Sequence, residues 1–242
     1  KDYGEASQIV AGNITENTRL YKKNVYLLQG DVYVSNKAVL TIEPGTIILA
    51  DAGTGATLII TKGATIMADG LETDPIVFTS NKVMKKAGDW GGIIVLGDAP
   101  SNKLGNISSV NFELDNISSI YGGNNSNSNS GILRYVRIEF AGKKTKNFGN
   151  FNALLLAGVG NKTILDNIMV SYCLGNAFEI NGGEVNLNKL VSFKTNSIDY
   201  KFNFGTQSKI DNSLAIRNSY VSSSNGSKCL SVLSYDTKSQ VD

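Results

Sequence analysis

Four charged side chains in the last third of the chain have types and spacing suited to chemistry on an acidic substrate. Glu179 and Asp199 lie about 20 residues apart, the length of one repeat in a stacked protein, within the similar strings NAFEI (176–180) and NSIDY (196–200). If these strings stack, both carboxylates face outward about 4.8 Å apart, where they repel each other or bind a cation such as Ca²⁺. Lys194 and Arg217 each follow an apolar triplet, and either could then serve as the base of a Ca²⁺-assisted polysaccharide lyase.

The alternative is that these four side chains are ordinary solvated charges on an outer surface. Ca²⁺ normally takes about six or more oxygen ligands, and two carboxylates supply too few. Lys201 follows directly after the second string and would neutralise part of the acidic pair. We favour this alternative, with no cofactor and with Ca²⁺ as the candidate ion if one is bound.

Three aromatic residues are candidates for contact with a glycan. Trp90 stands between Asp89 and two glycines, and Tyr121 and Phe148 lie in polar stretches rich in Asn and Lys. Aromatic rings beside amides on loops suit sugar or protein contact. The alternatives are that Trp90 packs against its own turn and that Tyr121 and Phe148 fix their loops to the body of the protein.

Composition excludes several other classes of function. Histidine is absent, which removes the usual general base and the commonest zinc ligand. The net charge of +2 does not favour a nucleic-acid partner, because such a protein needs a basic stripe to displace counterions. No apolar run reaches the roughly 18 residues of a membrane span. We predict Cys173 and Cys229 to be free, buried thiols, since they should lie several repeats apart.

The elements that must position these residues are repeats. Residues 39–51 (VLTIEPGTIILAD) and 57–69 (TLIITKGATIMAD) match at most apolar positions, and 25–34 has the same strand–corner–strand form. Four later triplets also align: 138–140 (IEF), 170–172 (VSY), 191–193 (VSF) and 214–216 (LAI). Short strand-like stretches at a period near 20 residues, with Gly, Asn and Asp at the corners, indicate stacked coils. The alignment predicts that Ile138, Val170, Val191 and Leu214 form one interior column. A second column beside it is predicted from Phe140, Tyr172, Phe193 and Ile216.

The predicted fold is therefore all-β: a single-stranded right-handed parallel β-helix, or solenoid, with two loop insertions. We assign 1–20 to an N-terminal cap or lead-in, 21–233 to the β-helix domain and 234–242 to a C-terminal tail. The insertions are expected at about 101–131 and 142–150. Helices are expected to be few, because no apolar period of 3.6 residues persists.

Several strings resemble a known family. LTIEPGTII, GDWGGIIVLGDAP (88–100), YGG (121–123), NSGILRYVRIEFAG (129–142) and LLLAGVGNKTILDNIMVSY (154–172) are similar to exported right-handed β-helix proteins of Bacteroidota. These are surface or lipoprotein-like chains of the pectate-lyase-like superfamily, without a firmly assigned activity. The resemblance implies export to the outer membrane surface or the extracellular space, with a lipid anchor on a removed N-terminus and no membrane span.

The last third departs from that family. Its members tend to carry runs of Asp with Trp after the VSY and VSF strands, where this chain has 173–179 (CLGNAFE) and 194–199 (KTNSID). Any ligand site built on those acids is expected to be lost or altered here. We therefore predict a non-catalytic binding or structural module that contacts a polysaccharide or a neighbouring surface protein, with the lyase as the alternative.

Overall fold

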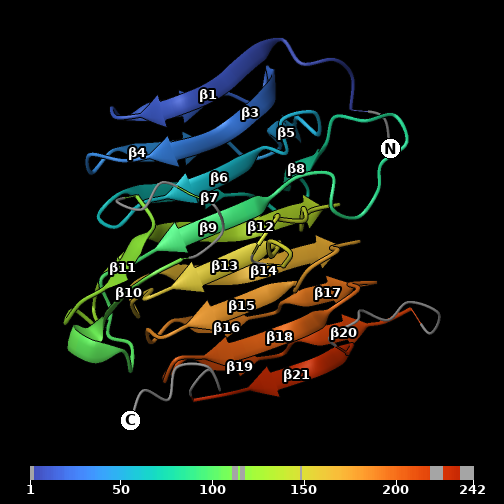
Figure 1. Cartoon of the computed structure of the whole chain (residues 1–242). Coiled ribbons are helices and arrows are strands. Elements are labelled where there is room, and N and C mark those ends of the chain that lie inside the picture. The colour runs from blue at the N-terminus through green and yellow to red at the C-terminus, as the bar shows by residue number, and fades with distance from the viewer. Residues whose placement is uncertain (1–2, 111–113, 115–117, 148, 219–225, 235–242) are drawn as a thin grey trace.

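The chain coils into a parallel β-helix, as the repeats predict. The computed structural model describes residues 3–110, 114, 118–147, 149–218 and 226–234. Within these residues, 19 strands join in one continuous sheet, and its pairings along the coil are all parallel. Figure 1 shows the coils stacked from β1 at one end to β21 at the other. The predicted fold class is confirmed.

Each full coil passes through three faces, which we number along the chain. Face 1 contains β1 (Gln8–Ile14), β3 (Val25–Val34), β5 (Ile47–Ala50), β8 (Ile76–Ser80), β12 (Gly131–Glu139), β14 (Ile164–Ser171), β17 (Val191–Phe193) and β20 (Leu214–Ile216). Face 2 contains the ends of β1 and β3, then β6 (Thr57–Ile60), β9 (Gly92–Leu96), β13 (Leu154–Ala157), β15 (Phe178–Asn181), β18 (Ile198–Asn203) and β21 (Lys228–Val232). Face 3 contains β2 (Thr18–Leu20), β4 (Val39–Ile42), β7 (Thr65–Asp69), the starts of β12 and β14, β16 (Asn186–Asn188) and β19 (Lys209–Asp211).

The core is built from columns of like side chains. Parallel pairing without stagger places each inward side chain above its counterpart in the next coil, about 4.8 Å away. On face 2, Ile93, Leu154 and Phe178 follow one another in register and are fully buried. The ring of Phe178 stacks on that of Tyr200 in the next coil, with centroids 5.5 Å apart. These columns are what the sequence repeats encode.

The first insertion leaves the coil between β9 and β12, and the second between β12 and β13. The first contains a 3₁₀ turn (Leu104–Asn106) and an antiparallel pair, β10 (Ile107–Ser109) with β11 (Ile120–Gly122). Both insertions fold over the outside of face 2, where they bury a second apolar cluster outside the coil. That cluster contains Ile59, Ile94, Leu96, Val110, Tyr121, Phe151, Leu155 and Ala157.

One predicted column is wrong by a single residue. Ile138 pairs with Val170, and Val191 pairs with Leu214, as expected. Between them, however, Val170 pairs with Ser192 instead of Val191. Because side chains alternate between the two faces of a strand, a shift of one residue exchanges inside and outside. Ser192 is therefore buried, whereas Val191 and Leu214 lie on the outer surface.

The second predicted column is affected by the same shift. Phe140 and Tyr172 stack at 5.1 Å, but each occupies a corner in the left-handed region, with φ of 62° and 56°. Phe193 is paired one position earlier, with Ser171, and Ile216 follows it in register. The rings thus line the edge of face 1 instead of its interior.

Parallel pairing begins at Gln8, which pairs with Tyr26, so the first coil lies within the stretch that the sequence assigned to a cap. Both cysteines are free, as predicted, but only Cys173 is buried, whereas Cys229 on the terminal strand β21 is exposed. Burial raises the pKa of the Cys173 thiol to about 12. Over the described ranges, no helix has the length and apolar character that crossing a membrane requires.

Candidate functional site

Asp199 lies inside the coil, contrary to the prediction that it faces solvent. Its carboxylate is 0 % exposed at the start of β18. The Ser192 hydroxyl donates a hydrogen bond of 2.6 Å to one oxygen, and the Arg217 guanidinium donates to the other. Arg217 also donates to the Ser197 carbonyl at 2.8 Å. A buried carboxylate requires hydrogen-bond donors and an opposite charge of this kind. Asp199 therefore has a structural role in the interior of the coil.

Glu179 lies on the outer surface of face 2 and is almost covered by the insertions. Lys201, its partner in the next coil, donates at 3.2 Å. The side-chain amides of Asn152 and Asn176 donate to its other oxygen at 3.0 and 2.8 Å. The register pairs Phe178 with Tyr200, so Glu179 meets Lys201 and not Asp199. The predicted pair of stacked carboxylates does not form.

The two basic candidates make different contacts, although they occupy matching positions in successive coils. Phe193 pairs with Ile216, so the residues that follow them, Lys194 and Arg217, align as predicted. The Lys194 ammonium lies 5.0 Å from the centre of the Phe193 ring and 6.0 Å from that of Tyr172. Arg217 instead turns inward to Asp199. The four side chains do not line one groove, and the lyase arrangement is not assembled.

The two described aromatic candidates, Trp90 and Tyr121, are buried and not exposed on the surface where a glycan could stack on them. Trp90 is fully buried, and its indole N–H donates to the Glu139 carbonyl at 2.7 Å. Tyr121 is 1 % exposed within the outer apolar cluster, and burial raises the pKa of its hydroxyl to about 12. Neither ring is available to a ligand at the surface. Phe148 lies outside the described residues.

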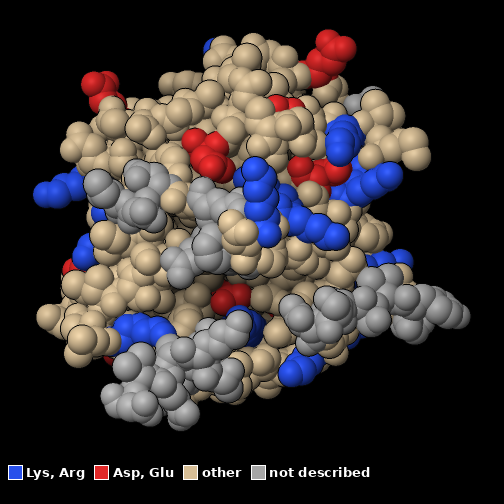
Figure 2. All heavy atoms as spheres, viewed as in Figure 1, with Lys and Arg blue, Asp and Glu red and all other residues tan. Residues whose placement is uncertain are grey.

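The charged surface beside the end of β8 is organised by internal pairing. Figure 2 shows basic side chains gathered near β8 with acidic side chains close to them. Asp89 accepts from the Lys82 ammonium at 2.8 Å, the Lys86 backbone N–H at 2.9 Å and the Ser80 hydroxyl at 2.7 Å. Burial alone would raise the pKa of Asp89, but these donors lower it below the usual range. Over the described residues, no group of three or more acidic or cysteine side chains could hold a metal ion.

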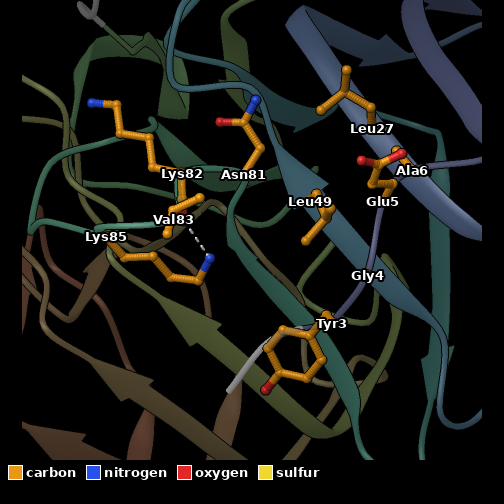
Figure 3. Close-up of a pocket in the computed structure, with 10 residues that line it drawn as sticks. All are labelled: Tyr3, Gly4, Glu5, Ala6, Leu27, Leu49, Asn81, Lys82, Val83 and Lys85. Carbon is orange, nitrogen blue, oxygen red and sulfur yellow. Dashed lines mark hydrogen bonds between the residues drawn. The ribbon is translucent and has the colours of Figure 1, made fainter.

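Two hollows lie on the outside of face 1. The larger, of about 660 Å³, we call the upper groove; Leu27 and Leu49 form its floor. Figure 3 shows the N-terminal residues Tyr3–Ala6 on one side of it and residues 81–85 on the other. Its lysines already have partners, because Lys82 binds Asp89 and the Lys85 ammonium donates to the carbonyls of residues 80 and 82.

The smaller hollow, of about 250 Å³, lies at the corner between faces 3 and 1, and we call it the ladder groove. Tyr135, Asn167 and Lys189 occupy the same position in three successive coils, because the residues two places before them pair in register. All three have left-handed backbones, with φ of 48°, 52° and 53°. Arg137 and Glu72 complete the polar lining, and Met169 and Val191 the apolar part.

Among the described residues, the ladder groove contains two basic side chains without a carboxylate partner, beside the Asn167 amide, which donates to Asp166 at 2.8 Å. In the described parts of the chain, Arg137 and Lys189 form no ion pair with a carboxylate. Each lies on the exposed surface, while Tyr135 is half-buried. A ring, an amide and two cations therefore converge on one shallow cleft. Such a set can contact the apolar face and the hydroxyl or carboxylate groups of a sugar.

This groove was not predicted, although the sequence contains a signal for it. The repeats LRYV (133–136), LDNI (165–168), LNKL (187–190) and IDNS (210–213) carry the ladder residues at their third letter. Corner positions in the left-handed region favour Gly and Asn, and Tyr135 and Lys189 depart from that preference. Those two departures, at equivalent corners, were the observation that could have located the site.

Comparison with known proteins gives the family. The Pectate-lyase like beta helix domain matches residues 12–229, which is most of the chain. No curated protein and no solved structure matches the chain. The match runs from within β1 to within β21 and includes both insertions and the ladder groove. The chain therefore belongs to the pectate-lyase-like β-helix domain family.

Proposed function

We propose that this protein is a non-catalytic binding module, exported and displayed at a bacterial surface, that binds a glycan in the ladder groove. The observation that carries the proposal is the column of Tyr135, Asn167 and Lys189, beside Arg137, in an open cleft. Successive coils repeat every 4.8 Å or so, a spacing comparable to one sugar unit. An extended glycan can therefore meet one rung after another without a deep pocket.

The charge of the groove narrows the class of glycan. Arg137 and Lys189 outnumber Glu72 among its charged lining residues, so carboxylated polysaccharides should bind better than neutral ones. The side chains named earlier as lyase candidates support binding over catalysis. Asp199 and Arg217 neutralise each other in the interior, and Glu179 is held by Lys201 and two amides. The proposal requires no metal ion.

The test is affinity electrophoresis and calorimetry with a panel of neutral and acidic polysaccharides, at low and high salt. Tyr135→Ala and Arg137→Ala should each weaken binding at least about tenfold, which corresponds to ~1.4 kcal/mol. Tyr21→Ala and Arg19→Ala are matched controls, because these exposed residues lie at the N-terminal coil, outside the groove. They should leave binding unchanged.

Three results would contradict the proposal. If the protein bound none of the polysaccharides, a glycan would not be its ligand. If the control variants lost as much affinity as the groove variants, the ladder groove would not be the binding site. Release of unsaturated oligosaccharides by the wild-type protein would show that the module is an enzyme.

A further inference from the structure

Over the described residues, the N-terminal end of the solenoid is not covered by another segment. A hollow of about 550 Å³ occupies the mouth of the first coil, and residues of its interior, including Val10, Ile14 and Leu20, line it. The preceding described residues do not cross this end, because residues 3–6 line the upper groove on face 1. β1 and β2 each pair on one side only, with β3 and β4, so their outer backbone groups have no strand partner in the described structure.

The C-terminal end presents the complementary surface. β21 pairs with β18 alone, and β20 with β17 alone, over the described residues. Leu230 and Val232 on β21 pair with Tyr200 and Phe202, so they continue the interior columns of face 2. With no coil beyond them in the described chain, these two side chains are 56 % and 66 % exposed. Unpaired edges with apolar side chains are surfaces that proteins normally cover.

The two ends match because the same columns run between them. One column of face 2 begins at Ile14 and ends at Val232, passing in register through Val34, Ile60, Val95, Leu156, Ile180 and Phe202. On face 3 a column begins at Leu20 and ends at Ile210, passing through Ile42, Ala68, Leu133, Leu165 and Leu187. Setting the last coil of one molecule on the first coil of another places Val232 over Ile14 and Ile210 over Leu20.

We propose that a second copy of this chain docks on the open N-terminal coil through its own C-terminal coil, head to tail. The contact continues all three faces as parallel sheets, satisfies both edges and fills the hollow with apolar side chains. Because the two contacting surfaces differ, each dimer retains one free end of either kind, and growth is linear. The ladder groove lies on the flank of the solenoid, so the grooves of successive copies follow one another along the assembly.

The test uses two variants that each block one end of the full chain. The first variant carries Val10→Lys and Ile14→Lys and is blocked at the N-terminal end. The second carries Leu230→Lys and Val232→Lys and is blocked at the C-terminal end. Charged side chains on an edge prevent strand addition. Circular dichroism and thermal unfolding first establish that both variants are folded monomers. Leu104→Lys is the control, because this exposed residue lies on the first insertion, away from both ends.

Sedimentation from about 1 µM to about 1 mM covers the range in which weak interfaces form. The wild-type protein and the control should increase in mass with concentration beyond a dimer. Each blocked variant should stay monomeric alone, and an equimolar mixture should stop at a dimer, because only one pair of native ends remains. A wild-type protein that stays monomeric throughout would overturn the proposal. So would a mixture that stays monomeric, or a dimer formed by either variant alone.

Discussion

The Asp199 carboxylate has no access to solvent and has a structural role inside the coil, where a solvated surface charge was favoured and metal binding was the weaker possibility. The strings around Glu179 and Asp199 look equivalent, but the register pairs Glu179 with Lys201 and leaves Asp199 two residues away, next to the corner where β18 begins, with its carboxylate buried. There the carboxylate depends on the Arg217 guanidinium and the Ser192 hydroxyl. Desolvating a charge is costly, and the cost appears in full when its partner is removed.

Arg217→Ala should therefore destabilise the protein by about 3–5 kcal/mol. The matched control is Arg134→Ala, which breaks a bidentate pair with Asp69 whose side chains are both well exposed to solvent. Solvent screens such a pair, so this loss should be at most about 1 kcal/mol. Urea unfolding at neutral pH measures both. Equal effects of the two substitutions would show that Asp199 is not isolated from water.

At the scale of elements, the insertions are part of the packed structure and not only polar loops. The sequence predicted two polar loop insertions with candidate ligand-binding aromatics, and packing of these loops on the body of the protein was the alternative. The structure instead places Tyr121 and Phe151 against the outward side chains Ile94 and Leu155 of face 2. Outward positions that carry aliphatic residues in consecutive coils were the signal that something covers this part of the face.

Phe151→Ala should cost about 3–5 kcal/mol, because it leaves a cavity in the outer cluster. Tyr172→Ala is the control; its ring stacks on Phe140 but is 37 % exposed, and removing it should cost about 1 kcal/mol. Chemical denaturation followed by circular dichroism compares the two. If Phe151→Ala lowered the free energy of unfolding less than Tyr172→Ala, the contact of the second insertion with face 2 would not stabilise the protein.

At the scale of the whole molecule, the coils differ in how well their interiors are filled. The middle coils contain Leu154, Leu156, Phe178 and Ile180, all fully buried. Near the C-terminal end, Ser192 replaces an aliphatic residue in its column, and β20 and β21 are open to solvent. In a solenoid each coil is stabilised chiefly by its neighbours, so stability should fall toward the end.

Hydrogen exchange should show this gradient. Amides of β20 and β21 should exchange at least about tenfold faster than those of β13 and β15, since end coils open without the rest of the molecule. The measurement belongs at micromolar concentration, below the range of head-to-tail association, and repeating it at high concentration should slow β21 selectively. Uniform protection across all coils would indicate a single cooperative unit with no frayed end.

The sequence by itself determined the architecture. Repeated apolar alternation, corner glycines and asparagines, and the lack of helical periodicity leave stacked parallel coils as the arrangement that buries every column. The match between residues 39–51 and 57–69, however, predicted the wrong strand pairs: it aligns β4 with β6 and β5 with β7, whereas β4 pairs with β7 and β5 pairs with β3 and β8. The positions of both insertions were also evident, since each interrupts the period.

Only the tertiary structure decided which side chains are inside, how the insertions cover face 2, and where an open groove remains. A strand alternates its side chains every residue, so the pairing of Val170 with Ser192 instead of Val191 reversed the faces that the similar triplets were predicted to share. Sequence similarity between repeats favoured the wrong register, because Val191-Ser192-Phe193 resembles Val170-Ser171-Tyr172 and not the residues 169–171 with which it pairs. Burial of the competing side chains selects the register, and that requires all the coils to be in place.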